Sequence, residues 1–263
     1  MNGNGVLAFM VRSYYTIQRT RISMGNMASA FWRGVSGPRE DTVSKAAFIT
    51  RLEEMSGDWK AQEEEIARDV AREIKRYPVW TEWLSRVKGC GEMLGAVIIT
   101  EFNIEIATTV SKMWQFAGLN PGMVRGWKSD GKDKDGWPKW KITEDMIRGD
   151  RLTPGYRSPF NKRLRTALCG KLGPSILKAQ GEYAISYYYP MHVPKDRRDE
   201  LGPGRYDVEE GWKDKSEGHR SRAAIRYMIK AFVRDLYVAW RTLEGLSVRE
   251  PYAEEYLGKQ HSA

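Results

Sequence analysis

Val87-Lys88-Gly89-Cys90-Gly91 is the stretch from which the fold of this chain is inferred. An apolar segment that includes Trp80 and Leu84 leads into it, and a second apolar segment, residues 94–99, follows. This order predicts a helix-hairpin-helix, because glycines permit a positive φ or a close backbone approach at the bend. The first amides of the outgoing helix lie unpaired at the positive end of its dipole, where a phosphate fits beside Lys88. We therefore expect a contact with a nucleic-acid backbone that reads no bases; the alternative is a tight turn between two core helices.

The composition is that of a globular protein with a polyanionic partner. The chain has 263 residues, of which 41% are hydrophobic and 29% charged, and it is long enough to bury a core. Its formal net charge of +9 favours nucleic acid or an acidic membrane surface as the partner. Two cysteines, Cys90 and Cys169, are too few for a disulfide scaffold, so a reducing cytoplasm is the expected compartment. The histidines at 192, 219 and 261 show no zinc-ligand spacing, and no metal site is predicted.

The N-terminal region, residues 1–80, is predicted to be helical. Residues 6–32 are rich in aromatic and basic side chains, and Gly34–Pro38 ends that helix. Residues 43–77 place apolar side chains at spacings of three, four and seven, with charges on the other side. Such a long amphipathic helix packs in a bundle or coiled coil, so it is the candidate surface for a homo-oligomer. The apolar run 6–11 is far shorter than the roughly 20 residues of a membrane span, and no membrane partner is expected.

The second region, residues 81–263, is predicted to hold the helix-hairpin-helix core and one long loop. Helices are expected at residues 92–102 and 108–116, the latter opened by a Thr or Ser and closed by Gly118. Residues 123–160 contain three tryptophans among Lys, Asp and Gly, which predicts a loop with at most a short hairpin at 137–142. The aspartates near Gly136 resemble a calcium loop, but the spacing lacks the required glutamate, so calcium is rejected.

Two basic segments extend the predicted phosphate contact. Asn161 is the expected N-cap of a helix whose first turn is cationic. A last helix over 216–243 carries arginines and a lysine four residues apart beside its apolar stripe, a pattern that suits a phosphate backbone. The alternative for both segments is an ordinary solvated surface. The predicted DNA-binding residues are Lys88, Gly89, Cys90, Gly91, Asn161, Lys162, Arg163, Arg165, His219, Arg220, Arg222, Arg226, Lys230 and Arg234.

Three motifs in this order give the chain a family resemblance. Val87–Gly91 with the preceding Leu84, the helix end Trp114–Pro121, and Asn161–Leu168 resemble the C-terminal domain of bridge-RNA-guided insertion-sequence transposases. Those enzymes combine an acidic domain similar to Holliday-junction resolvases with a C-terminal domain that carries a serine nucleophile. The resemblance covers roughly residues 45–181. The tail, from His219 through the tyrosine at 252 to the histidine at 261, looks like that of transposase-like proteins without the acidic domain.

The chain departs from the family pattern at both catalytic elements. Residues 1–80 lack the strands and carboxylate set of the acidic domain. The family's serine lies soon after Gly-Leu-x-Pro, whereas here the nearby hydroxyl, Ser129, stands further along. The resemblance makes Ser129 the candidate nucleophile, with only Arg125 and Lys128 near it in sequence to activate it. The alternative is an ordinary loop serine.

These observations predict an all-α protein: a long amphipathic helix and a helix-hairpin-helix core, with a Trp/Lys-rich loop and a basic C-terminal helix. The expected function is DNA binding, with RNA as an alternative partner, by a protein derived from a mobile-element transposase. We expect it in the cytoplasm, associated with the bacterial nucleoid or encoded by a mobile element. One rival is an active transposase or recombinase with a separate acidic domain or a guide RNA, and only that enzyme would need magnesium. The other rival is an oligomeric scaffold that binds no nucleic acid.

Overall fold

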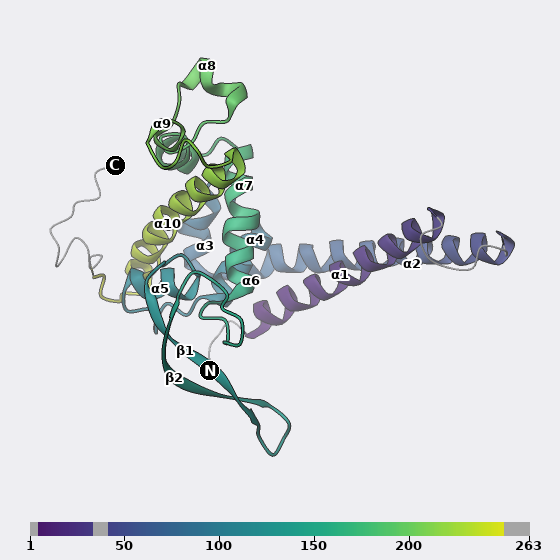
Figure 1. Ribbon diagram of the computed structural model, residues 1–263. Coiled ribbons are helices and arrows are strands. Elements are labelled where there is room, and N and C mark those ends of the chain that lie inside the picture. Colours follow the sequence, from purple (N-terminus) through teal and green to yellow (C-terminus); the bar gives the residue numbers. More distant parts are fainter. Residues whose placement is uncertain (1–4, 34–41, 250–263) are drawn as a thin grey trace. The chain divides into compact units, whose positions relative to one another are not determined.

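The chain forms two compact units, Met1–Tyr77 and Pro78–Ala263. The structure, a computed structural model, describes residues 5–33 and 42–249 (Figure 1). The predicted helix end at residues 34–38 and the tail positions 252 and 261 lie outside the described residues. No helix in the described ranges combines the length and the apolar character needed to cross a bilayer.

The first unit is a pair of long antiparallel helices, α1 (Gly5–Trp32) and α2 (Thr42–Glu73). A small core of Ala28, Ile49 and Leu52 joins them near the connection. Further along, the buried carboxylate of Glu63 accepts hydrogen bonds of 2.7 Å from Gln18 Nε2 and Arg21 Nε of α1. The two predicted helices are therefore present, and α2 packs on α1 of the same chain. Of the predicted periodic face, Leu52 and Val70 are buried, whereas Phe48 and Met55 are exposed. A 3₁₀ turn over Ile74–Arg76 ends this unit.

The second unit is mostly helical and is built around α10 (Glu217–Leu243). Its predicted apolar stripe is the core: Ile229, Phe232 and Leu236 are fully buried. The other helical elements are α3 (Pro78–Glu82), a 3₁₀ turn (Leu84–Arg86), α4 (Glu92–Glu101), α5 (Val110–Phe116), α6 (Lys162–Arg165), a π-helical segment (Thr166–Leu172), α7 (Gly173–Lys178), a second π-helical segment (Ala184–Tyr188), a 3₁₀ turn (Lys195–Arg197), α8 (Arg198–Leu201) and α9 (Arg205–Val208). Helices α3, α5 and α7 pack directly on α10.

Side-chain caps fix two of the predicted helix starts. The Thr109 hydroxyl accepts the amide of Lys112 at the start of α5, and the Asn161 side chain accepts the amide of Leu164 at the start of α6. Each cap satisfies an amide that the helix itself leaves unpaired.

The predicted helical class is confirmed in part: the described residues are mostly helical, but residues 123–148 form a β-hairpin where a loop with only a short hairpin at 137–142 was predicted. Strands β1 (Met123–Lys132) and β2 (Pro138–Arg148) form an antiparallel hairpin that extends away from the helices of its unit (Figure 1). Asp133 shapes its turn, because its carboxylate accepts the amides of Asp135 and Trp137 at 2.9 and 2.8 Å. The register shifts twice, once on each side of the Trp127–Ser129 segment.

Candidate nucleic-acid interface

The bend Lys88–Gly91 lies at the surface between the 3₁₀ turn Leu84–Arg86 and α4. Lys88 and Gly91 are exposed, and Gly91 is the N-cap residue of α4, where no side chain caps the helix. Space around Gly91 is open: a Cβ there would meet no atom within 4 Å. The Cys90 amide, by contrast, donates to the Val87 carbonyl at 2.9 Å, so it closes the bend and does not face a ligand. Of the predicted amide donors, those at the start of α4 thus remain open.

The bend is held against the C-terminal part of α7. Gly89 has φ of +95°, and a Cβ there would lie 2.7–2.8 Å from backbone atoms of Ser175 and Ile176. A Cβ on Gly181 would likewise lie close to Lys88, 3.0 Å from its carbonyl oxygen. The helix that packs against the bend, α7, ends at Lys178, which is exposed. Sequence reasoning missed Lys178 because nothing in the local pattern places α7 there.

The predicted cations of α6 do not join the bend. Asn161 and Arg163 contact Glu101, the last residue of α4, at 2.7 and 3.3 Å. The bend begins the same ten-residue helix, so about 15 Å of helix separates the two groups. Arg165 turns inward, donates to the carbonyls of Gly118 and Asp150, and lies 4.7 Å from the Phe160 ring centroid. It is a structural residue, and only Lys162 of this group is fully exposed.

The row of cations on α10 divides between surface and interior. Arg222 is exposed and Arg226 half-buried. Lys230 lies over the Trp114 ring at 4.4 Å, and burial lowers its pKa. Arg234 is paired with Asp235 at 2.8 Å. The helix therefore offers Arg222, with Arg226 beside it, rather than the continuous stripe that the spacing predicted.

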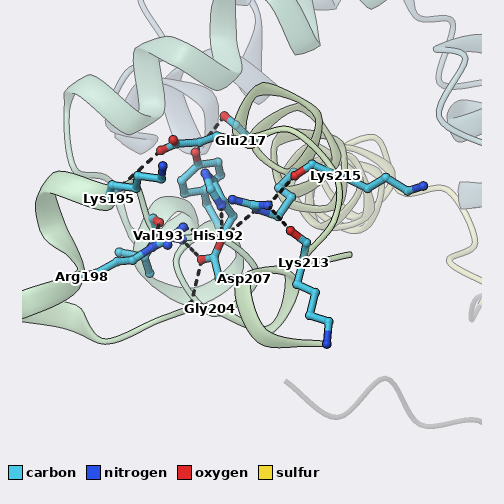
Figure 2. A network of polar contacts seen from close by, with 12 residues as sticks. His192, Val193, Lys195, Arg198, Gly204, Asp207, Lys213, Lys215 and Glu217 are labelled. Carbon is cyan, nitrogen blue, oxygen red and sulfur yellow. Dashed lines mark hydrogen bonds and ion pairs between the residues drawn. The ribbon is translucent and has the colours of Figure 1, made fainter. Parts of the chain in front are cut away.

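Arg220 lies inside the protein, although His219 beside it is exposed. The Arg220 side chain donates to the buried carboxylate of Asp207 at 3.1 Å and to the carbonyls of Lys213 and Lys215. Figure 2 shows this network, in which His192 and Arg198 also reach Asp207, at 2.7 and 2.9 Å. With 7% of its surface exposed, Arg220 is not placed to contact DNA.

Ser129 lies on the exposed β-hairpin, opposite Trp140. Its sequence neighbour Lys128 is held by Asp145 at 2.9 Å, on a carboxylate that the Tyr156 hydroxyl also reaches at 2.7 Å. Lys128 is therefore not free to activate the serine. The two cysteines offer no reactive thiolate either, because burial raises the pKa of Cys90 to about 12 and that of Cys169 to about 11. Across residues 5–33 and 42–249, no group of three or more His, Cys, Asp or Glu side chains is arranged to hold a metal ion.

A groove beside β1 is the feature that sequence reasoning missed. It has a volume of about 430 Å³ and is lined by Phe116, Trp127 and Phe160, with Arg157 and Asn161 at its edge. Three aromatic residues and a cation in one groove are a recurring arrangement for binding bases. The sequence signal, tryptophans among lysines at 127–141, was present, but the short hairpin predicted at 137–142 does not include Trp127, which lies on β1.

Comparison of the chain with protein-family models, with curated proteins and with solved structures finds no match.

Proposed function

We propose that this chain is a DNA-binding protein related to mobile-element transposases, and that the bend Lys88–Gly91, between the 3₁₀ turn Leu84–Arg86 and α4, contacts the phosphate backbone as the bend of a helix-hairpin-helix would. The observation that carries the proposal is the open, uncapped start of α4 at Gly91, next to the exposed Lys88. Backbone amides at a helix N-terminus bind phosphate through hydrogen bonds and the helix dipole. A contact of this kind reads no sequence.

The surrounding charges support the same ligand. Lys88 lies on the bend, and Lys178 ends the helix that packs against it. Two exposed acids oppose this attraction: Glu92 in the first turn of α4, and Glu182, which follows the Gly181 that packs against Lys88. The net charge of +9 adds a general attraction to polyanions.

Replacing Gly91 by Glu is expected to weaken DNA binding about tenfold, since a second carboxylate then faces the phosphate at close range. Gly91 has φ of −79° and no neighbour within 4 Å of a Cβ, so the substitution leaves the fold intact. Gly91→Gln is the matched control, equal in size but uncharged, and should stay within about threefold of the wild type. Fluorescence anisotropy with a labelled 30-base-pair duplex measures both variants.

The same assay, repeated with duplex DNA, a four-way junction, single-stranded DNA and RNA at rising salt, defines the ligand. Wild-type affinity should fall steeply between low and moderate salt, and Lys88→Ala should reduce the salt slope by about one. If Gly91→Glu and Gly91→Gln bind DNA with equal affinity, the bend is not part of the DNA interface. Absence of salt-dependent binding to all four nucleic acids would reject DNA binding and leave the scaffold hypothesis.

A further inference from the structure

We infer that the groove beside β1 binds an unpaired nucleotide, with its base stacked on Trp127 and its phosphate held by Arg157. The groove lies on the β-hairpin and the segment that follows it, not at the bend Lys88–Gly91. It is therefore a site of its own, and it adds single-stranded nucleic acid to the backbone contact proposed above.

Backbone hydrogen bonds build the groove and fix its width. The Arg157 amide donates to the Trp127 carbonyl at 2.8 Å, and the Asn161 amide donates to the Phe116 carbonyl, also at 2.8 Å. The first bond joins the start of the segment 157–161 to β1, and the second joins its end to the last residue of α5. The backbone that carries the aromatic rings is thus fixed before any ligand arrives, which lowers the entropic cost of binding.

The rings in the groove leave a large aromatic surface in water. Trp127 is 42% exposed and Phe116 is 43% exposed. Phe160 has a guanidinium, that of Arg165, 4.7 Å from its ring centroid. A flat ligand that enters the groove would cover the exposed ring surface and gain both stacking and burial of apolar area.

The charges at the groove select a nucleotide over an apolar peptide. Among the described residues that line it, none is acidic, and Arg157 is exposed at its edge. The Arg157 guanidinium lies 5.7 Å from the Trp140 ring centroid, so a second indole orients it. Lys162, which follows Asn161, is exposed as well. Cations beside aromatic rings match the alternation of phosphate and base along a single strand.

Duplex DNA does not fit this groove, because its bases are paired and stacked inside the helix. Single strands present every base face, and stacking on a tryptophan tolerates any base. The inferred ligand is therefore an unpaired nucleotide of DNA or of RNA. The two sources share this chemistry and are separated only by the test.

The test uses the full chain with two oligonucleotides of equal charge, a 20-mer of deoxythymidine and a 20-mer of abasic deoxyribose phosphate. Wild-type protein should bind the thymidine strand about tenfold more tightly, because only this strand has bases to stack. Trp127→Ala should lose that advantage and leave duplex affinity unchanged. Trp127→Tyr, which keeps an aromatic face, should retain most of the preference for the thymidine strand over the abasic strand. A 20-mer of uridine run in parallel shows whether RNA is accepted equally.

Two further readouts separate stacking from charge. A single 2-aminopurine in the thymidine strand should lose fluorescence on binding to the wild type and not to Trp127→Ala. Arg157→Ala should weaken the thymidine and abasic strands to the same extent and reduce the salt slope by about one. Equal wild-type affinity for the thymidine and abasic strands, or unchanged thymidine binding by a folded Trp127→Ala, would overturn the inference. Either result would leave the duplex contact at Gly91 standing.

Discussion

Replacement of Asp207 by alanine is expected to lower the free energy of unfolding of the Pro78–Ala263 unit by about 4 kcal/mol, since it leaves buried cations unpaired. The Asp207 side chain is fully buried. One of its oxygens accepts from side chains and the other from the amides of Val193 and Gly204, at 2.8 and 3.1 Å (Figure 2). The side-chain donors are His192, Arg198 and Arg220.

Asp207→Asn is nearly as severe, at about 3 kcal/mol. The amide oxygen of the new asparagine can accept either from the side chains or from the two backbone amides, but not from both sets. Its amide nitrogen, a donor, then faces the other set of donors. Asp199→Ala, which removes an exposed carboxylate of α8, is the control and should stay within about 0.5 kcal/mol of the wild type. Urea unfolding followed by circular dichroism gives all three values. A loss below about 1 kcal/mol for Asp207→Ala would show that the network does not stabilise the fold.

The same network gives the stability a defined pH dependence. Burial by itself would raise the pKa of Asp207, but the Val193 amide and the His192 side chain outweigh it and hold the pKa below its usual value. A carboxylate with a depressed native pKa stabilises the fold above its unfolded pKa of about 3.9 and loses that effect as the pH falls toward the native value. The stability difference between the wild type and Asp207→Asn should therefore be largest near neutral pH and shrink below about pH 4. A difference that stays constant from pH 7 to pH 3 would contradict this assignment.

The Asp207 network also shows where sequence reasoning about α10 could not succeed. His219, Arg220 and Arg222 are all cationic or titratable residues at the start of one helix, and spacing alone placed them on one binding surface. Arg220 points inward because its partner Asp207 lies 13 residues upstream, in the short helix α9. A pairing of that kind depends on tertiary packing, which the local pattern does not encode.

The helices themselves were predictable because their signals are local. The apolar period gave α10 as 216–243 against an observed Glu217–Leu243, and the Gly91 bend gave the start of α4. Asn161 was identified as a cap from its position before a helical segment, and its side chain fulfils that role. Apolar residues recur at helical spacing in a sequence because one face of the helix is buried.

The extent of the β-hairpin, which was expected to be short and confined to residues 137–142, was missed for the opposite reason. An alternating pattern appears when a strand buries one face and exposes the other. Most residues of β1 and β2 are exposed, with Gly126 and Ile147 the buried exceptions, so no alternation was selected. The residues Asp133–Gly136 resemble a calcium loop in sequence, and in the structure they form the turn of the hairpin.

Gly89→Ala is expected to destabilise the second unit by about 3 kcal/mol, from the combined costs of a left-handed alanine and of overpacking. The new Cβ would lie within 2.8 Å of the Ile176 amide nitrogen and Cα, which are backbone atoms of α7. Because backbone cannot swing aside as a flexible side chain does, the bend or α7 must shift. Urea unfolding measures the loss, and a value within 1 kcal/mol of the wild type would show that the bend is not fixed against α7.

Gly91→Ser is the matched control, two residues away in the same bend. Gly91 has φ of −79° and open space around it, and serine is a favourable N-cap, so stability should hold or rise slightly. The serine hydroxyl would nevertheless compete for the amides at the start of α4, and phosphate binding should weaken. One glycine therefore allows the bend to pack, and the other keeps the helix end open. Because the two substitutions act on different quantities, together they separate the stability of the bend from its affinity for DNA.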